Sequence, residues 1–268
     1  MPDISPRDPS KPLTYADYLR LDELLSLQSP ESEEHDEVLF IVVHQVYELW
    51  FKEILHELDR LVELLAGGRT PEALHTLKRV LTILKIAVAQ LDVLETMTPL
   101  EFLSFRDRLA TASGFQSAQF RELEFALGKK SRGTLEHFPT GTPWRRRLER
   151  RWESPTVWDA LLRYLDGRGH DVPEAALDRD VTGPVEASET VQTVLLEVYR
   201  NDSLAGHVCE RLVDLDEGIQ EWRYRHVKMV ERTIGGRRGT GGSAGAEYLR
   251  TTLSDPLFPD LWSIRKAF

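Results

Sequence analysis

One uninterrupted helical pattern constrains the fold more than any other feature of the sequence. From His35 the chain reads HDEVLFIVVHQVYELWFKEILHELDRLVELLAGG, with apolar residues recurring every three or four positions and no glycine before Gly67. That spacing predicts a single very long amphipathic helix, closed by the glycine pair. Alternating strand patterns are almost absent from the rest of the chain. The sequence therefore predicts an all-α helical bundle.

Shorter segments on either side of this helix also carry helix signals. Residues 13–27, LTYADYLRLDELLSL, predict a short helix with its apolar residues on one side. Residues 70–72 combine a cap residue, a proline and an acid, which predicts a helix start; this helix is expected to run to about Thr96. Thr98 is expected to cap the helix after it.

The remaining segments set the domain organisation. Residues 186–234 are helical in pattern, with a break expected around residues 201–202. Residues 131–190 contain many prolines, glycines and charges, and are predicted to form a peripheral helical region. Residues 1–12 read as a flexible arm, so that residues 13–268 are predicted to form a single all-α domain.

Composition narrows the class of protein. The 268 residues include six tryptophans and 41% apolar residues, which favours a packed globular protein over disorder. A net charge of −10 disfavours nucleic-acid binding, and no apolar run is long enough for a membrane span or a signal peptide. The single cysteine, Cys209, favours a reducing compartment, and a cytoplasmic protein is expected.

The glycine-rich stretch GGRRGTGGSAG, from Gly235, is unusual in a helical chain. It lacks the lysine and the preceding strand of a phosphate-binding loop, and the missing strand also excludes a dinucleotide-binding turn. A flexible linker is one interpretation. The other is a mobile lid over a small anionic ligand, formed by residues 235–246, with Thr240 and the neighbouring arginines close to that ligand.

Two histidines interrupt apolar helical stripes. His44 lies on one stripe with Phe40, Tyr47 and Phe51, and His226 lies at the centre of a second stripe near the other end of the chain. A lone histidine on an apolar face is usually a hydrogen-bonded core residue. Two on separate long helices favour a shared ligand, and a neutral imidazole in an apolar pocket suits a haem iron.

Arg106 is a third anomaly, because it stands on the apolar side of its predicted helix, four residues after Phe102. Burial of an unpaired guanidinium is costly. Either an internal acid or the carboxylate of a ligand is expected to pair with it.

A di-iron site is a competing interpretation. The pairs Glu53/His56 and Glu72/His75 have the Glu-x-x-His spacing of carboxylate di-iron bundles. However, Glu72 occupies a first turn, where acids favour the helix dipole, and the further inward glutamates that such a site needs are not evident.

Longer blocks of sequence resemble the tryptophan 2,3-dioxygenase family. The likeness extends from about Leu13 to Arg265, and its most specific blocks are SGFQSAQFR and RGTGGSAG. The resemblance implies a homotetrameric, all-α enzyme with haem b, active with iron(II). Such an enzyme inserts both atoms of O₂ across the indole C2–C3 bond of L-tryptophan and gives N-formyl-L-kynurenine in tryptophan catabolism.

The resemblance also implies roles for individual residues. His226 matches the proximal iron ligand, and His44 matches the distal histidine that accepts a hydrogen bond from the indole N–H. Arg106 matches the arginine that binds the substrate carboxylate, and Thr240 matches a loop threonine at the amino-acid end of the substrate. The other matched positions are Phe40 and Phe102, which wall the indole, Ser113 beside the haem pocket, and Tyr15 and Leu19, which reach into a neighbouring subunit's site.

Two departures leave the substrate open. Phe102 stands where some bacterial members have tyrosine, and Ala244 replaces a common serine. The motifs are also compatible with a related monooxygenase that forms a 2-oxindole from tryptophan or β-methyltryptophan in natural-product biosynthesis. A haem sensor or carrier without turnover is a further hypothesis, although mere haem binding needs neither Arg106, Thr240 nor His44.

Overall fold

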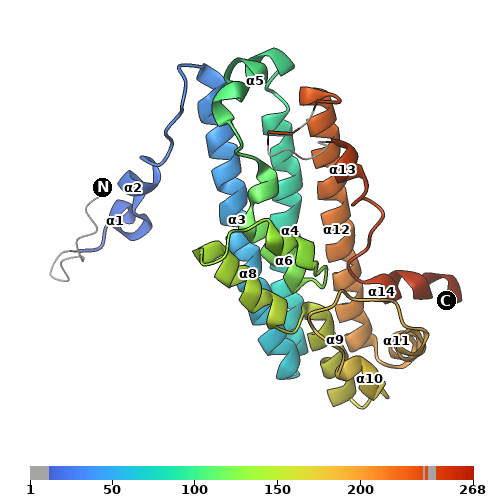
Figure 1. The fold of residues 1–268 in the computed structure, drawn as a ribbon. Helices are drawn as coiled ribbons and strands as arrows, with labels where there is room; N and C mark the ends of the chain where they lie inside the picture. Colours follow the sequence, from blue (N-terminus) through green and yellow to red (C-terminus); the bar gives the residue numbers. More distant parts are fainter. Residues whose placement is uncertain (1–11, 238, 241–245) are drawn as a thin grey trace.

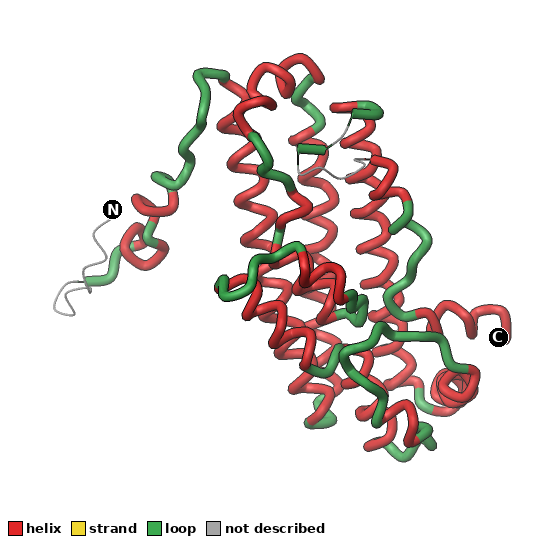
Figure 2. The backbone as a smooth tube through the Cα atoms, in the orientation of Figure 1, coloured by secondary structure: helices red, strands yellow, loops and turns green. Residues whose placement is uncertain are grey.

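The computed structural model describes residues 12–237, 239–240 and 246–268, and within these ranges every regular element is a helix (Figures 1 and 2). The α-helices are α1 Tyr15–Leu19, α2 Leu21–Leu24, α3 His35–Ala66, α4 Thr70–Leu94, α5 Pro99–Arg106, α6 Ala118–Ala126, α7 Arg132–Glu136, α8 Pro143–Glu153, α9 Val157–Gly167, α10 Glu174–Leu177, α11 Glu189–Asn201, α12 Ser203–Ile234, α13 Ala246–Arg250 and α14 Pro259–Ser263. Short 3₁₀-helices are η1 Asp107–Leu109, η2 Gly114–Gln116 and η3 Ile264–Ala267. The predicted all-α class is confirmed.

The long helices α3, α4 and α12 form the centre of the molecule and run side by side (Figure 1). α4 packs against both of the others, and the apolar residues between them are buried. Gly218 on α12 permits a close approach to α4, because a Cβ at this position would lie 2.6 Å from Leu84 Cδ2. A larger residue would displace the Leu84 side chain from its packed position between the two helices.

Most predicted helix ends agree with the structure. α3 ends at Ala66, α5 is capped by the Thr98 side chain, and α11 and α12 meet at Asp202. The start of α4 differs in one detail, because Thr70 is already helical and makes no cap. Its hydroxyl instead forms a buried hydrogen bond of 2.7 Å with the Tyr164 hydroxyl.

The region 131–190 is less peripheral than the sequence predicts. Its helix α9 packs on α3 and buries Val157, Trp158 and Leu161 in the main core. The prolines, glycines and charges on either side of α9 hide this apolar stripe in the sequence. Lys130 fixes the segments that flank α9, since its ammonium group donates to the backbone oxygens of Trp152, Ser154 and Val181 at 2.8, 2.6 and 2.6 Å.

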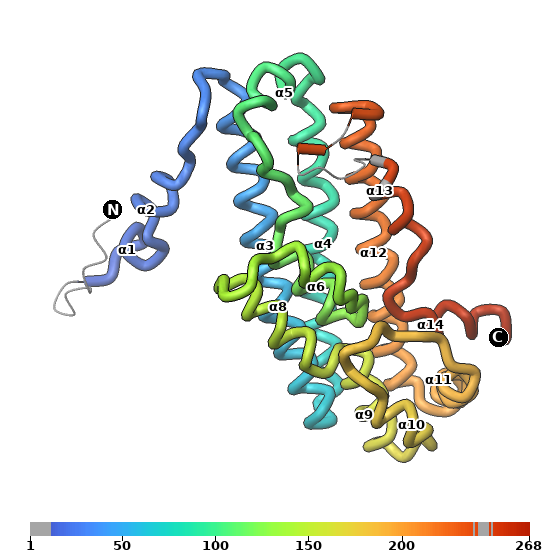
Figure 3. Tube along the Cα trace, in the orientation of Figure 1, coloured from blue at the N-terminus to red at the C-terminus, as the bar shows by residue number. Residues whose placement is uncertain are grey.

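The amino-terminal helices stand apart from the bundle (Figure 3). Residues 13–27 form two helices rather than one, because Arg20 adopts a left-handed conformation with φ 52° and ψ 47°. Neither α1 nor α2 contains a buried residue. The predicted arm, residues 1–12, lies outside the described residues except for Pro12. In the described ranges, each helix is too short or too polar to cross a lipid bilayer.

Candidate active site

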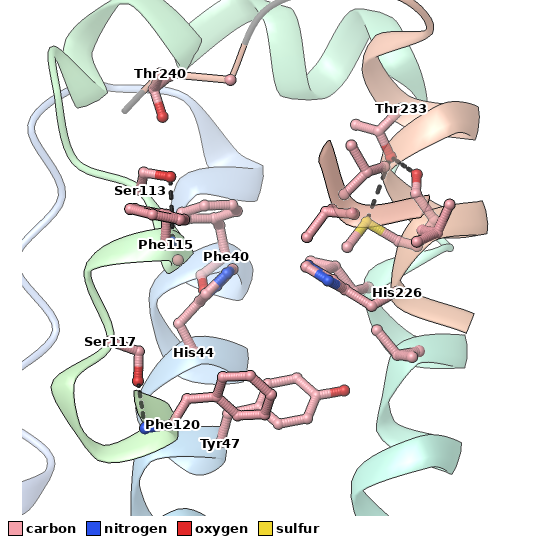
Figure 4. Close-up of a pocket in the computed structure, with 18 of the residues that line it drawn as sticks. Phe40, His44, Tyr47, Ser113, Phe115, Ser117, Phe120, His226, Thr233 and Thr240 are labelled. Carbon is pink, nitrogen blue, oxygen red and sulfur yellow. Dashed lines mark hydrogen bonds between the residues drawn. The ribbon is translucent and has the colours of Figure 1, made fainter. Parts of the chain in front are cut away.

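One cavity lies between the amino-terminal half of α3, the segment from α5 to α6, and the carboxyl-terminal half of α12 (Figure 4). It brings together seven of the nine residues with a predicted role in the site, which are Phe40, His44, Phe102, Arg106, Ser113, His226 and Thr240. They come from α3, α5, α12 and two loops, so the fold assembles the cavity from segments far apart in the chain. Their convergence is the main structural support for a shared ligand.

The α3 wall is aromatic apart from His44 and Glu48. Phe40 and His44 lie in contact, with 4.1 Å between their ring centroids, and Tyr47 and Phe51 continue the stripe below them. The Tyr47 hydroxyl donates to the backbone oxygen of Ala87 on α4 at 2.8 Å, which fixes its ring against the cavity. The stripe predicted from the sequence therefore faces one cavity.

The hydrogen bond of His44 determines its tautomer. Nδ1 lies 2.7 Å from the backbone oxygen of Phe40, which can only accept, so Nδ1 carries the proton. Burial lowers the pKa of His44 and favours the neutral ring. In that form Nε2 has a free lone pair, and His44 is an acceptor at this atom.

The α12 wall carries His226, which faces His44 across the cavity (Figure 4). Burial, and after it the nearby His44 and Arg121, lower the pKa of His226 to about 4. Its ring is therefore neutral at pH 7. The Trp222 indole stacks beside it, with 5.1 Å between centroids and 15° between planes. A neutral imidazole held in one orientation is what a metal centre needs.

The α5 wall supplies Phe102 and Arg106. Phe102 lies 5.7 Å from Phe40, centroid to centroid, and together they form an aromatic corner with the fully buried Phe105. Arg106 is the last residue of α5 and is half-buried in the cavity wall, as the apolar position in the sequence predicted.

The loop residues close the same end of the cavity. Ser113 lies at the start of η2, where its hydroxyl accepts from the Phe115 N–H at 3.3 Å. Thr240 comes from the glycine-rich stretch, and its hydroxyl donates to the backbone oxygen of Ala112 at 2.5 Å. Thr240 is therefore held against the segment between α5 and α6, at Ala112, next to Ser113 in the chain, and both hydroxyl residues line the cavity. Arg238 and residues 241–245, which include Ala244, lie outside the described residues.

Two predicted site residues do not reach this cavity. Tyr15 and Leu19 are on α1, with exposed fractions of 75% and 41%, and they do not line it.

The di-iron interpretation is not supported. His56, Glu72 and His75 are exposed, and Glu72 pairs with Arg69. In the described ranges, no group of three or more histidine, cysteine, aspartate or glutamate side chains could hold a metal ion.

Sequence reasoning missed a charged part of the wall. Arg121, Glu124 and Arg223 line the cavity, and they lie on α6 and α12. In addition, the buried Trp222 Nε1 has no hydrogen-bond partner. The only signal in the sequence was the i,i+3 spacing of Arg121 and Glu124, which is common on solvated helices.

Fold and cavity together define an all-helical protein with a cavity lined by two neutral histidines and an arginine. Comparison with known proteins identifies the protein family. Residues 3–140 and 187–268 match the family model described as tryptophan 2,3-dioxygenase. The chain belongs to the tryptophan 2,3-dioxygenase family, a family of oxidoreductases.

The similarity to individual relatives is close and nearly complete. The chain is 58% identical to the tryptophan 2,3-dioxygenase of Herpetosiphon aurantiacus, over 96% of this chain and 98% of that protein. It is 61% identical to the enzyme of the same name from an Anaeromyxobacter strain, over 96% and 97%. The protein of this name from Caulobacter vibrioides is 47% identical, over 94% and 97%.

Proposed function

We propose that this protein is a haem-dependent dioxygenase that inserts both atoms of O₂ across the indole C2–C3 bond of L-tryptophan, giving N-formyl-L-kynurenine. The observation that carries the proposal is the arrangement of the cavity, where a neutral His226 faces a His44 whose Nε2 can accept a hydrogen bond. Arg106 lines the same cavity. The name shared by the close relatives supports the reaction.

The cavity fits haem b, a flat apolar ring with two carboxylates. Phe51, Phe120 and Trp222 provide apolar surface, and His226 provides the neutral imidazole that iron prefers. The unpaired Trp222 N–H and the Arg121 guanidinium are donors suited to the carboxylates. Haem would supply the iron(II) that reacts with O₂, a chemistry that no side chain offers.

The protein's own groups would hold the substrate. The Arg106 guanidinium binds the carboxylate of L-tryptophan, and the hydroxyls of Thr240 and Ser113 lie near this amino-acid end. The indole packs against the aromatic corner of Phe40 and Phe102, and its N–H donates to His44 Nε2. Residues 235–246 act as a lid that keeps water out of the cavity when substrate is bound.

The active assembly is proposed to be a homotetramer in the cytoplasm. Tyr15 and Leu19 are exposed on α1, and in the assembly they extend into the site of a neighbouring copy. A monomer in size-exclusion chromatography with light scattering at micromolar concentration would contradict this assembly.

The test of the function uses the full chain reconstituted with haem b and reduced. Incubation with L-tryptophan and O₂ should yield N-formyl-L-kynurenine, identified by chromatography and mass spectrometry. A haem carrier or sensor would bind haem and give no product. The His226→Ala variant should lose most haem binding, and a normal Soret band in this variant would show that another residue binds the iron.

A further inference from the structure

Arg121 and Arg223 share one buried carboxylate at the cavity wall. Glu124 accepts from the Arg121 guanidinium at 2.5 Å through Oε2 and from Arg223 at 3.1 Å through Oε1. The side chains of Arg121, Glu124 and Arg223 are 12%, 9% and 4% exposed. Both oxygens of Glu124 are therefore occupied, and the carboxylate fixes two guanidiniums from two different helices.

The charges of this wall do not cancel. Two guanidiniums meet one carboxylate, and the remaining charged residues that line the described cavity are Arg106 and Glu48. The Glu48 carboxylate accepts from the Gln119 amide at 2.8 Å. The wall thus has an excess positive charge in a poorly solvated place, which favours an anionic group on the bound ligand.

The same ion pairs connect the cavity to the chain that follows the glycine-rich stretch. Arg223 also donates to the backbone oxygens of Thr252 and Asp255, at 3.4 and 3.3 Å. Thr252 lines the cavity, and the Asp255 carboxylate pairs with Lys129 at 2.7 Å. A displacement of Glu124 would therefore shift both the Arg121 guanidinium and the segment that follows α13.

We infer that Glu124 is a positioning residue: it holds Arg121 at the cavity wall for a carboxylate of the porphyrin and, through Arg223, links that carboxylate site to residues 252–255. This inference rests on the proposed binding of haem, and it assigns a role to a residue that touches neither substrate nor iron.

Helix α6 offers a matched control. Glu122 stands two residues from Glu124, its side chain is 10% exposed, and it pairs with Arg147 and Arg151 at 2.9 and 3.3 Å. It does not line the cavity. Glu122→Gln therefore removes a similar buried charge, also shared by two arginines, on another face of the same helix.

The experiment compares haem b with its dimethyl ester, which lacks the negative charges. Soret titrations of the haem-free full chain give both dissociation constants, and their ratio reports recognition of the carboxylates. The wild type and Glu122→Gln should bind haem b at least tenfold more tightly than the ester. In Glu124→Gln, binding of haem b should weaken by about tenfold while ester binding changes little, so the ratio approaches one.

Amide hydrogen exchange tests the link to residues 252–255. Haem b should slow exchange there in the wild type and in Glu122→Gln, and should do so much less in Glu124→Gln. If Glu124→Gln does not fold, Glu124→Asp is tested in its place. This variant keeps the charge but withdraws it by one methylene, and its ratio of the two dissociation constants should fall several-fold.

The outcomes separate the inference from the function on which it rests. A folded Glu124 variant with the wild-type ratio and wild-type exchange overturns the role of Glu124, even if the enzyme turns over normally. A wild type that binds both porphyrins equally also overturns it, because no carboxylate is then recognised. A wild type that binds no haem contradicts the proposed function itself.

Discussion

The Nδ1 atom of His44 lies 2.7 Å from the backbone oxygen of Phe40, one helical turn earlier on α3. The proton of the ring is thereby committed to the backbone, and Nε2 can only accept. Burial lowers the pKa of His44, so the ring is a poor candidate for a permanently charged group at pH 7. A neutral ring with a free lone pair on Nε2 is suited to accept a hydrogen bond from an indole N–H, and not to act as a strong acid.

The first prediction follows from this role. His44→Ala removes one hydrogen bond to substrate and should lower kcat/KM for L-tryptophan by about tenfold to a hundredfold, without abolishing turnover. Haem binding should be unchanged, because His226 lies on the other helix. Loss of the Soret band in His44→Ala would instead identify His44 as an iron ligand.

The second prediction concerns the carboxylate of the substrate. Arg106→Lys keeps the charge but removes the planar fork, and should raise KM for L-tryptophan by roughly tenfold to a hundredfold. Tryptamine, which has no carboxylate, should be affected much less. Arg108→Lys, at an exposed position two residues further along, is the control and should behave as wild type. Equal losses for both substrates would argue that Arg106 stabilises the wall rather than the ligand.

The third prediction concerns the stability of the haem-free protein. The pKa of His226 is lowered to about 4, whereas an unfolded chain takes up this proton near its ordinary value of 6.5. Between pH 6.5 and pH 4 the unfolded state therefore binds more protons than the folded state does. As the pH falls through this range, protonation of this one group should lower the free energy of unfolding by roughly 3 kcal/mol. Above pH 6.5 this contribution should not change.

Urea denaturation at pH 7 and at pH 4.5 measures this effect. His226→Leu lacks the titrating ring and should lose less stability between the two pH values than the wild type does. Because both chains share the same carboxylates, the difference between them isolates His226. Parallel losses would mean that the ring titrates in the folded state much as it does in the unfolded state.

How far the sequence could predict this site depends on whether the signal lies within one helix. Phe40 and His44 are one turn apart, so their shared face follows from the helical period, and the cavity confirms it. Arg106 was detectable because a guanidinium on an apolar face is costly. Each of these signals needs only local geometry.

The residues that were missed need knowledge of tertiary contacts. Glu124 and Arg223 are 99 positions apart in sequence, and their pairing depends on α6 packing near α12. Trp158 was assigned to a peripheral region because flanking prolines and glycines obscured a short helix, yet it is 2% exposed in the core. Tyr15 and Leu19 lie away from this chain's own cavity, so their proposed role depends on a second copy.

The last prediction concerns the fate of both oxygen atoms. Arg106 and Thr240 are proposed to recognise only the amino-acid end, which L-tryptophan and β-methyltryptophan share. Discrimination then depends on space beside the β-carbon, where one methyl group is worth about 1–3 kcal/mol.

The relatives at 58% and 61% identity are named as dioxygenases, and nothing in the cavity favours formation of a 2-oxindole. Turnover of L-tryptophan under ¹⁸O₂ should therefore give N-formyl-L-kynurenine that carries both labels by mass spectrometry. A singly labelled 2-oxindole as the main product, above all from β-methyltryptophan, would show that this cavity directs monooxygenation.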